Sequence, residues 1–196
     1  MYKKRFFAAL AACILLLAAT VHFYKEDQDA RLTLADHNLS AWNSLYWLAH
    51  DAGNYASAAE LSNSNYAARH NAIVYHSVVP HLTPRFDSNT FGFLTSEADL
   101  FVRLLTQADP NNEVTQKSFT LFQNLAEEIE SIASRVADHV KQGEKERLEL
   151  IDPKSEIYQQ LTQQIAACID TYLEDIVFLT PRLSYIIENP SSESPV

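Results

Sequence analysis

The sequence predicts an all-α protein: a single N-terminal transmembrane helix followed by an antiparallel up-down-up-down helical bundle with one broken limb. Three observations predict this fold. Glycine is scarce, with three residues in 196, whereas a sheet protein of this size needs more glycine in its turns. Apolar residues recur at steps of three and four, as on one side of a helix. A 19-residue run without a charged side chain lies near the N-terminus.

The apolar run extends from Phe6 to Tyr24 and includes Leu10 and Leu16. As a helix it spans roughly 28 Å, close to the hydrocarbon thickness of a bilayer. Basic residues precede it at 3–5, and the positive-inside rule keeps such a cluster in the cytoplasm. We therefore expect a cytoplasmic N-terminus at 1–5, a signal anchor at 6–24 in a bacterial inner membrane, and a periplasmic domain beyond it. Four residues mark the anchor: Phe6, Leu10, Leu16 and Tyr24.

Two other interpretations of this run stay open. A cleaved secretory signal has the same basic and apolar regions, although Ala18-Ala19-Thr20 is a poor cleavage site. Leu10-Ala11-Ala12-Cys13 looks like a bacterial lipoprotein box, but only a short apolar stretch precedes it. The length of the run favours the uncleaved anchor.

Charge and cysteine content limit the function of the remainder. The chain has a formal charge of −10, and its first 24 residues hold three basic and no acidic side chains, so the rest carries −13. This charge argues against nucleic acid as a partner and against a domain lying on anionic lipid. Cys168 is the one cysteine beyond the anchor, which rules out an intradomain disulfide. Its apolar neighbours predict a buried thiol, with an intermolecular disulfide as the alternative.

The first half of the domain reads as two helices, a loop and a short helix. A long helix continuous with the membrane run is expected from about 30 to Leu61, and Gly53 weakens it by about 1 kcal/mol. A second helix at 64–82 is ended or kinked by prolines. Residues 83–94 read as a loop, and a short helix follows at 96–108. The first helix has one apolar side, made of Ala35, Leu39, Trp42, Leu45, Ala49, Ala52, Ala56 and Ala59.

The second half reads as two long helices. The first covers 114–142 and ends at Gly143, the usual position for a terminating glycine. The second covers 153–180, starts at Asp152-Pro153 and is kinked or ended by Pro181. A bundle over 25–188 buries these apolar sides, with its second limb broken by the loop. An even number of limbs returns the last helix toward the membrane. The tail at 189–196 is expected to be disordered.

A search for catalytic and metal motifs predicts a protein that is not an enzyme and needs no cofactor or metal. His70, His76 and His81 are spaced by six and five, so they do not share one helical face. No Glu-x-x-His, G-x-S-x-G or glycine-rich phosphate loop occurs. The remaining candidates are interpreted as single structural histidines (His37, His50 and His139) and as solvated helix surface (Glu127, Glu128 and Glu130).

An aromatic-rich region gives the candidate ligand site. Aromatic walls with an arginine for an anionic group would form a membrane-distal pocket where the second limb is broken. The alternative is that these aromatics belong to the core and to the membrane-interface belt. The predicted ligand-binding residues are Trp42, Tyr46, Arg69, Tyr75, His76 and Arg85.

Two segments carry a family resemblance. Leu39-Ser-Ala-Trp42 gives a tryptophan-containing first helix after an anchor, and Arg69-His-Asn-Ala-Ile-Val-Tyr-His-Ser-Val-Val-Pro80-His-Leu82 precedes a long helix. The stretch from Asn38 to Ala108 thereby resembles the extracytoplasmic sensory region of bacterial membrane-anchored diguanylate cyclases and hybrid sensor histidine kinases. Such sensors have a second membrane span and a cytoplasmic output domain, whereas a polar tail follows Ile187 here. We expect either a fragment of a longer sensor or a module that signals through another protein.

The resulting expectation is a sensory module that binds a small ligand or an envelope cue. The alternative is a non-enzymatic accessory, adaptor or inhibitor protein that binds another envelope protein. Expected partners are the bilayer, a protein partner or a second copy through the alanine-rich first helix, and a small anionic ligand, with no nucleic acid.

Overall fold

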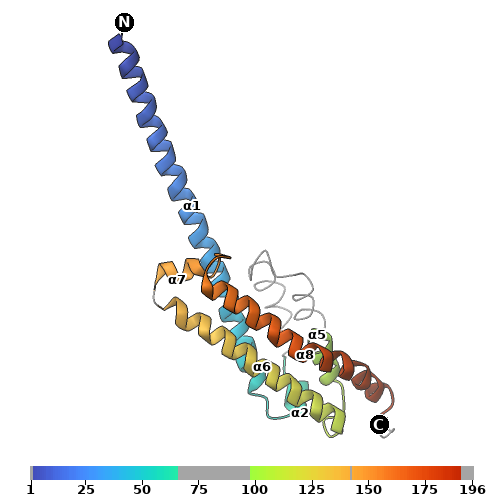
Figure 1. Ribbon diagram of the computed structural model, residues 1–196. Coiled ribbons are helices and arrows are strands. Elements are labelled where there is room, and N and C mark those ends of the chain that lie inside the picture. The colour runs from blue at the N-terminus through green and yellow to red at the C-terminus, as the bar shows by residue number, and fades with distance from the viewer. Residues whose placement is uncertain (1, 66–97, 142, 191–196) are drawn as a thin grey trace.

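The computed structural model describes residues 2–65, 98–141 and 143–190. Within these ranges every regular element is a helix and there is no strand, which confirms the predicted all-α class (Figure 1). The helices are α1 (Tyr2–Gly53), α2 (Ala58–Asn63), α5 (Ala98–Leu105), α6 (Glu113–Val140), α7 (Glu144–Glu149) and α8 (Glu156–Glu188).

The first part of α1 stands away from the other helices (Figure 1). Its apolar side chains are exposed on all sides: Phe6 is 65%, Leu10 47%, Leu16 68% and Tyr24 62% exposed. By length and composition it is the one helix, within the described residues, that could cross a membrane. The chain therefore has a candidate N-terminal transmembrane helix, as predicted.

A charged segment of α1 separates the apolar run from the domain. Residues 25–34 are exposed apart from a half-buried Leu32. One ion pair joins residues a turn apart in this segment, with 3.4 Å between Arg31 Nε and Asp27 Oδ2. Burial starts at Ala35, which is fully buried. Ten helical residues rise about 15 Å, so the packed domain begins that far beyond Tyr24.

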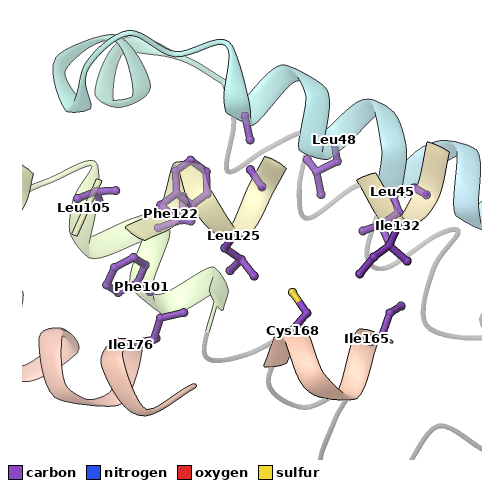
Figure 2. Close-up of a cluster of buried hydrophobic side chains, with 14 of the residues drawn as sticks. Leu45, Leu48, Phe101, Leu105, Phe122, Leu125, Ile132, Ile165, Cys168 and Ile176 are labelled. Atoms are coloured by element: carbon purple, nitrogen blue, oxygen red, sulfur yellow. The ribbon is translucent and has the colours of Figure 1, made fainter. Parts of the chain in front are cut away.

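The core forms where α1, α5, α6 and α8 meet. α1 packs against α6, α6 packs against α8, and α5 contacts both α6 and α8. Aliphatic and aromatic side chains from all four helices form one buried cluster (Figure 2). Ten of its members are Leu45, Leu48, Phe101, Leu105, Phe122, Leu125, Ile132, Ile165, Cys168 and Ile176.

Long-range contacts set the direction of each helix. His50 of α1 contacts Glu130 of α6, and Arg147 of α7 contacts Asp36 near the start of the packed part of α1. α6 therefore runs antiparallel to α1 and leads back toward the anchor. α7 lies beside the point where α1 enters the domain. α8 starts there and leads away from the anchor (Figure 1).

The prediction that the last helix returns toward the membrane is therefore wrong. α2 and α5, the described helices on either side of residues 66–97, both lie away from the anchor (Figure 1). The chain thus enters α6 from that end, which reverses the expected direction of both long C-terminal helices. Most of the predicted second limb falls outside the described residues, so a four-limb bundle stays a prediction.

Local capping explains where α1 ends. The predicted helix continued to Leu61, but α1 stops at Gly53 and a separate helix starts at Ala58. The Ser57 hydroxyl accepts a hydrogen bond from Glu60 N at 3.3 Å, and the Glu60 carboxylate accepts one from Ala56 N at 2.6 Å. This Ser-x-x-Glu arrangement resembles a capping box: it satisfies the Glu60 amide in the first turn of α2 and the Ala56 amide just before the helix.

α6 agrees with the prediction to within two residues at each end. The Asn112 side chain caps it by accepting from Val114 N at 2.9 Å. Gly143 follows its last turn with a φ of +154°, which favours glycine. The charged stretch beyond it forms α7, which the sequence analysis did not predict as a helix. α5 occupies eight residues of the predicted 96–108.

α8 differs from its prediction at both ends. Its N-cap is Ser155 rather than Asp152, because the Ser155 hydroxyl accepts from Tyr158 N while Asp152 accepts from Lys154 N in the preceding turn. Pro181 lies inside α8, which continues to Glu188. A helical proline costs about 3 kcal/mol. Burying Leu183 and Ile186 beyond it, at about 1.5–3 kcal/mol each, offsets this cost.

Candidate functional site

The predicted ligand site divides into a buried residue, a surface residue and residues outside the described ranges. Trp42 is 3% exposed and belongs to the core, so it cannot contact a ligand from solution. Tyr46, one turn later, is partly buried and reaches the surface. The pocket that these residues were predicted to line stays a prediction. The four residues outside the described ranges are Arg69, Tyr75, His76 and Arg85.

Tyr46 belongs to an aromatic cluster on α1 that also contains Trp47 and His50. The Tyr46 ring stacks on His50 with centroids 5.8 Å apart and planes at 8°. The Trp47 ring stands edge-on to both, 5.4 Å from Tyr46 and 5.7 Å from His50. Nevertheless Trp47 is 60% exposed. The cluster therefore holds a large indole in a defined orientation while leaving much of it in water.

His50 connects this cluster to α6. Its Nδ1 lies 2.9 Å from Glu130 Oε1, and the two side chains are 40% and 29% exposed. His50 is thus a partly buried structural histidine, as the sequence suggested, whereas Glu130 is paired with it rather than plain solvated surface. Their partnership could not be read from the sequence because 80 positions separate them. The spacing of four between Tyr46 and His50 was the local signal for one shared helix face.

A second polar group lies near the anchor, around a cavity of about 350 Å³ between the end of α6, α7 and the start of α8. His139 Nε2 lies 3.1 Å from Glu149 Oε2, and Lys145 Nζ lies 3.2 Å from the other carboxylate oxygen. His139 therefore also has a partner that the sequence did not indicate. The cavity is lined by His139, Glu149, Ser155, Glu156, Ile157 and Gln160.

Burial or a charged neighbour shifts the pKa values of three groups: Glu149 at the cavity, and Cys168 and Tyr172 on α8. The hydrogen bond from Lys145 lowers the pKa of the Glu149 carboxyl. Burial, with the nearby Glu128 carboxylate as the second cause, raises the pKa of the Cys168 thiol to about 12. Burial and a hydrogen bond to Glu128 raise the pKa of Tyr172 to about 12. Glu128 is partly buried and influences both of these α8 groups.

Two nucleophilic side chains, Cys168 and Ser155, are buried or engaged in hydrogen bonds. Cys168 is 2% exposed, and its raised pKa keeps the thiol protonated at neutral pH. The Ser155 hydroxyl is engaged in capping α8 and in a hydrogen bond to the Glu149 carbonyl. Among the described residues no three His, Cys, Asp or Glu side chains gather as metal ligands.

No family model matches the chain, and neither a curated protein nor a solved structure matches it. Function is therefore inferred from the geometry alone.

Proposed function

We propose that the chain is a single-pass, membrane-anchored accessory protein whose helical bundle, outside the cytoplasm, binds another protein. The continuity of α1 is the observation that carries this proposal. One helix provides an exposed apolar segment of membrane-spanning length and, after a charged segment, the buried residues from Ala35 to Ala52. Such a helix would hold the domain at a fixed distance from a bilayer.

The surface of the domain supports a binding role. Beyond the charged segment of α1, large apolar side chains of the described residues stay exposed on three helices: Trp47 on α1, Leu100 on α5, and Val177, Phe178 and Tyr185 on α8. Tryptophan, tyrosine and phenylalanine are enriched in protein interfaces, because they contribute large contact areas at low entropic cost.

Fractionation and topology test this proposal. The full chain should stay in the membrane pellet after carbonate extraction, with a mass of 22.2 kDa if the anchor is uncleaved. Alkaline phosphatase fused after the C-terminus should be active, and a green fluorescent protein fused there should be dark. A soluble, shortened product would support a cleaved signal and contradict the proposal.

A sensory role is the second candidate, and the cavity beside α7 favours it. Arg147 Nη1 of α7 lies 2.9 Å from Asp36 Oδ1 of α1, so a ligand that moved α7 would act directly on the anchoring helix. The volume of the cavity, about 350 Å³, is near the lower end for small-molecule sites. A sensor should gain thermal stability with one compound of a small-molecule panel. His139→Ala would remove this gain if the ligand binds the cavity, and Arg85→Ala if it binds the pocket predicted from the sequence.

A further inference from the structure

The indole of Trp47 is exposed to solvent, yet neighbouring side chains hold it in one orientation. Tyr46 and His50 contact it edge-on from the same helix, and Glu130 of α6 fixes His50 through the 2.9 Å contact. An aromatic side chain that is already oriented loses little entropy on binding, which is the property of an interface hot spot.

The distance of Trp47 from the apolar run along α1 argues against the membrane as its binding partner. Trp47 follows Tyr24 by 23 positions on one unbroken helix, so it lies about 35 Å beyond the apolar run along the helix axis. The polar headgroup region adds only about 5–8 Å on each side of the hydrocarbon core. The alternative of an interface-belt tryptophan therefore does not apply to Trp47.

The charge around Trp47 defines the chemistry of its partner. α1 has no Lys or Arg from Leu32 to Gly53, and α6 has none from Ser118 to Ser134. Glu130 of α6 lies against this cluster through its contact with His50, and its side chain is 29% exposed. On these two stretches a basic group of a partner would meet the Glu130 carboxylate and no lysine or arginine.

Arginine is the basic group that fits this surface best. Its planar guanidinium stacks on an aromatic face and pairs with carboxylates, and it is more weakly hydrated than a lysine ammonium. Stacking on an indole is worth about 0.5–2 kcal/mol, depending on burial.

We infer that the Trp47 face, defined as Tyr46, Trp47, His50 and Glu130, binds an arginine-bearing segment of a protein partner, with the guanidinium over the indole and beside the Glu130 carboxylate. This inference rests on the proposed protein-binding function and names the partner's chemistry.

A peptide titration of the full chain in nanodiscs of zwitterionic lipid tests the inference. The probe is the peptide acetyl-Arg-Leu-Arg-amide, and its control has citrulline in place of both arginines, which keeps the shape and removes the charge. Both tryptophans are replaced by 5-fluorotryptophan, so that the buried Trp42 serves as an internal reference in ¹⁹F spectra. The Trp47 signal should shift and saturate with the arginine peptide while the Trp42 signal stays in place.

The expected contrasts are quantitative. The citrulline peptide should bind about tenfold more weakly, the factor that corresponds to about 1.4 kcal/mol. Glu130→Gln, which removes the negative charge but keeps a hydrogen-bonding side chain next to His50, should weaken binding of the arginine peptide severalfold. Glu174→Gln, which removes an exposed carboxylate from α8, should leave the affinity for the arginine peptide unchanged.

Four results would overturn the inference: no shift of the Trp47 signal, equal shifts with both peptides, a shift that follows protein concentration without peptide, or one that follows lipid composition without peptide. The third would indicate a second copy on this face, and the fourth a lipid. Each leaves the carbonate-extraction and fusion results unchanged, so failure here is distinguishable from failure of the proposed function.

Discussion

The two tryptophans of α1 provide a matched pair for testing the packing of the anchoring helix. They lie five positions apart, but Trp42 is 3% exposed and Trp47 is 60% exposed. Truncating a buried Trp to Ala removes its packing and leaves a cavity, at a cost of about 3–5 kcal/mol. Truncating an exposed one removes only its local ring contacts, at about 1 kcal/mol or less.

The assay is thermal and urea unfolding of the full chain in detergent micelles, followed by circular dichroism. In a domain of this size 1 kcal/mol corresponds to about 2–4 °C, so Trp42→Ala should lower the Tm by roughly 6–20 °C, and Trp47→Ala by no more than a few degrees. Equal losses for the two variants would refute the placement of Trp42 in the core. A larger loss for Trp47→Ala would refute the orientation of α1 in which Trp42 faces the core and Trp47 faces solvent.

Three further predictions concern Gly53, Gly143 and the buried thiol of Cys168. Gly53→Ala should raise the free energy of unfolding by about 0.5–1 kcal/mol, because an added Cβ meets nothing within 4 Å, and no change in urea midpoint would count against it. Gly143→Ala should lower it by about 1–3 kcal/mol, because φ is +154°; a neutral result would show that this backbone relaxes freely. The free energy of unfolding should fall as pH rises from about 9 toward 12. Urea titrations across this pH range should show a smaller fall for Cys168→Ala than for the unsubstituted chain.

The sign of the alkaline effect follows from proton binding. The pKa of Cys168 rises from 9.0 to about 12 and that of Tyr172 from 10.0 to about 12 on folding. The folded state therefore holds both protons more tightly, and this contribution to stability is complete below pH 9. It is lost as pH rises through the folded-state values. The same burial should keep the Cys168 thiol unreactive to iodoacetamide in a folded Cys13→Ser variant and reactive in urea.

Features encoded by neighbouring residues could be predicted from the sequence. The apolar run from Phe6 to Tyr24 and the side of α1 that contains Trp42 depend on spacing alone. α6 was located closely because its apolar repeat is long and because Gly143 marks its end. The break at Gly53 was missed, since the Ser57–Glu60 cap, a local signal, competes with a weak continuation of the helix.

Features that depend on distant contacts could not be predicted. The direction of α8 follows from α7 lying beside α1, a contact across 111 positions between Asp36 and Arg147. The Trp47 face depends on the pairing of His50 with Glu130 across 80 positions. In the sequence, Trp42 fitted both the apolar side of the first helix and the wall of the predicted ligand pocket. Tertiary packing places it in the core. Neither amphipathic periodicity nor motif searches contain this information.

The central claim is that the anchor and the core of the domain share one continuous helix. Lys25 and Asn43 are both exposed on α1 and lie 18 positions, or five helical turns, apart on the same side. Electron–electron double resonance between spin labels at Lys25→Cys and Asn43→Cys, in the Cys13→Ser chain in nanodiscs, measures this span directly. We predict one narrow distance distribution centred at about 27 Å, the rise of 18 helical residues. A broad distribution, or one centred well below that distance, would contradict the claim.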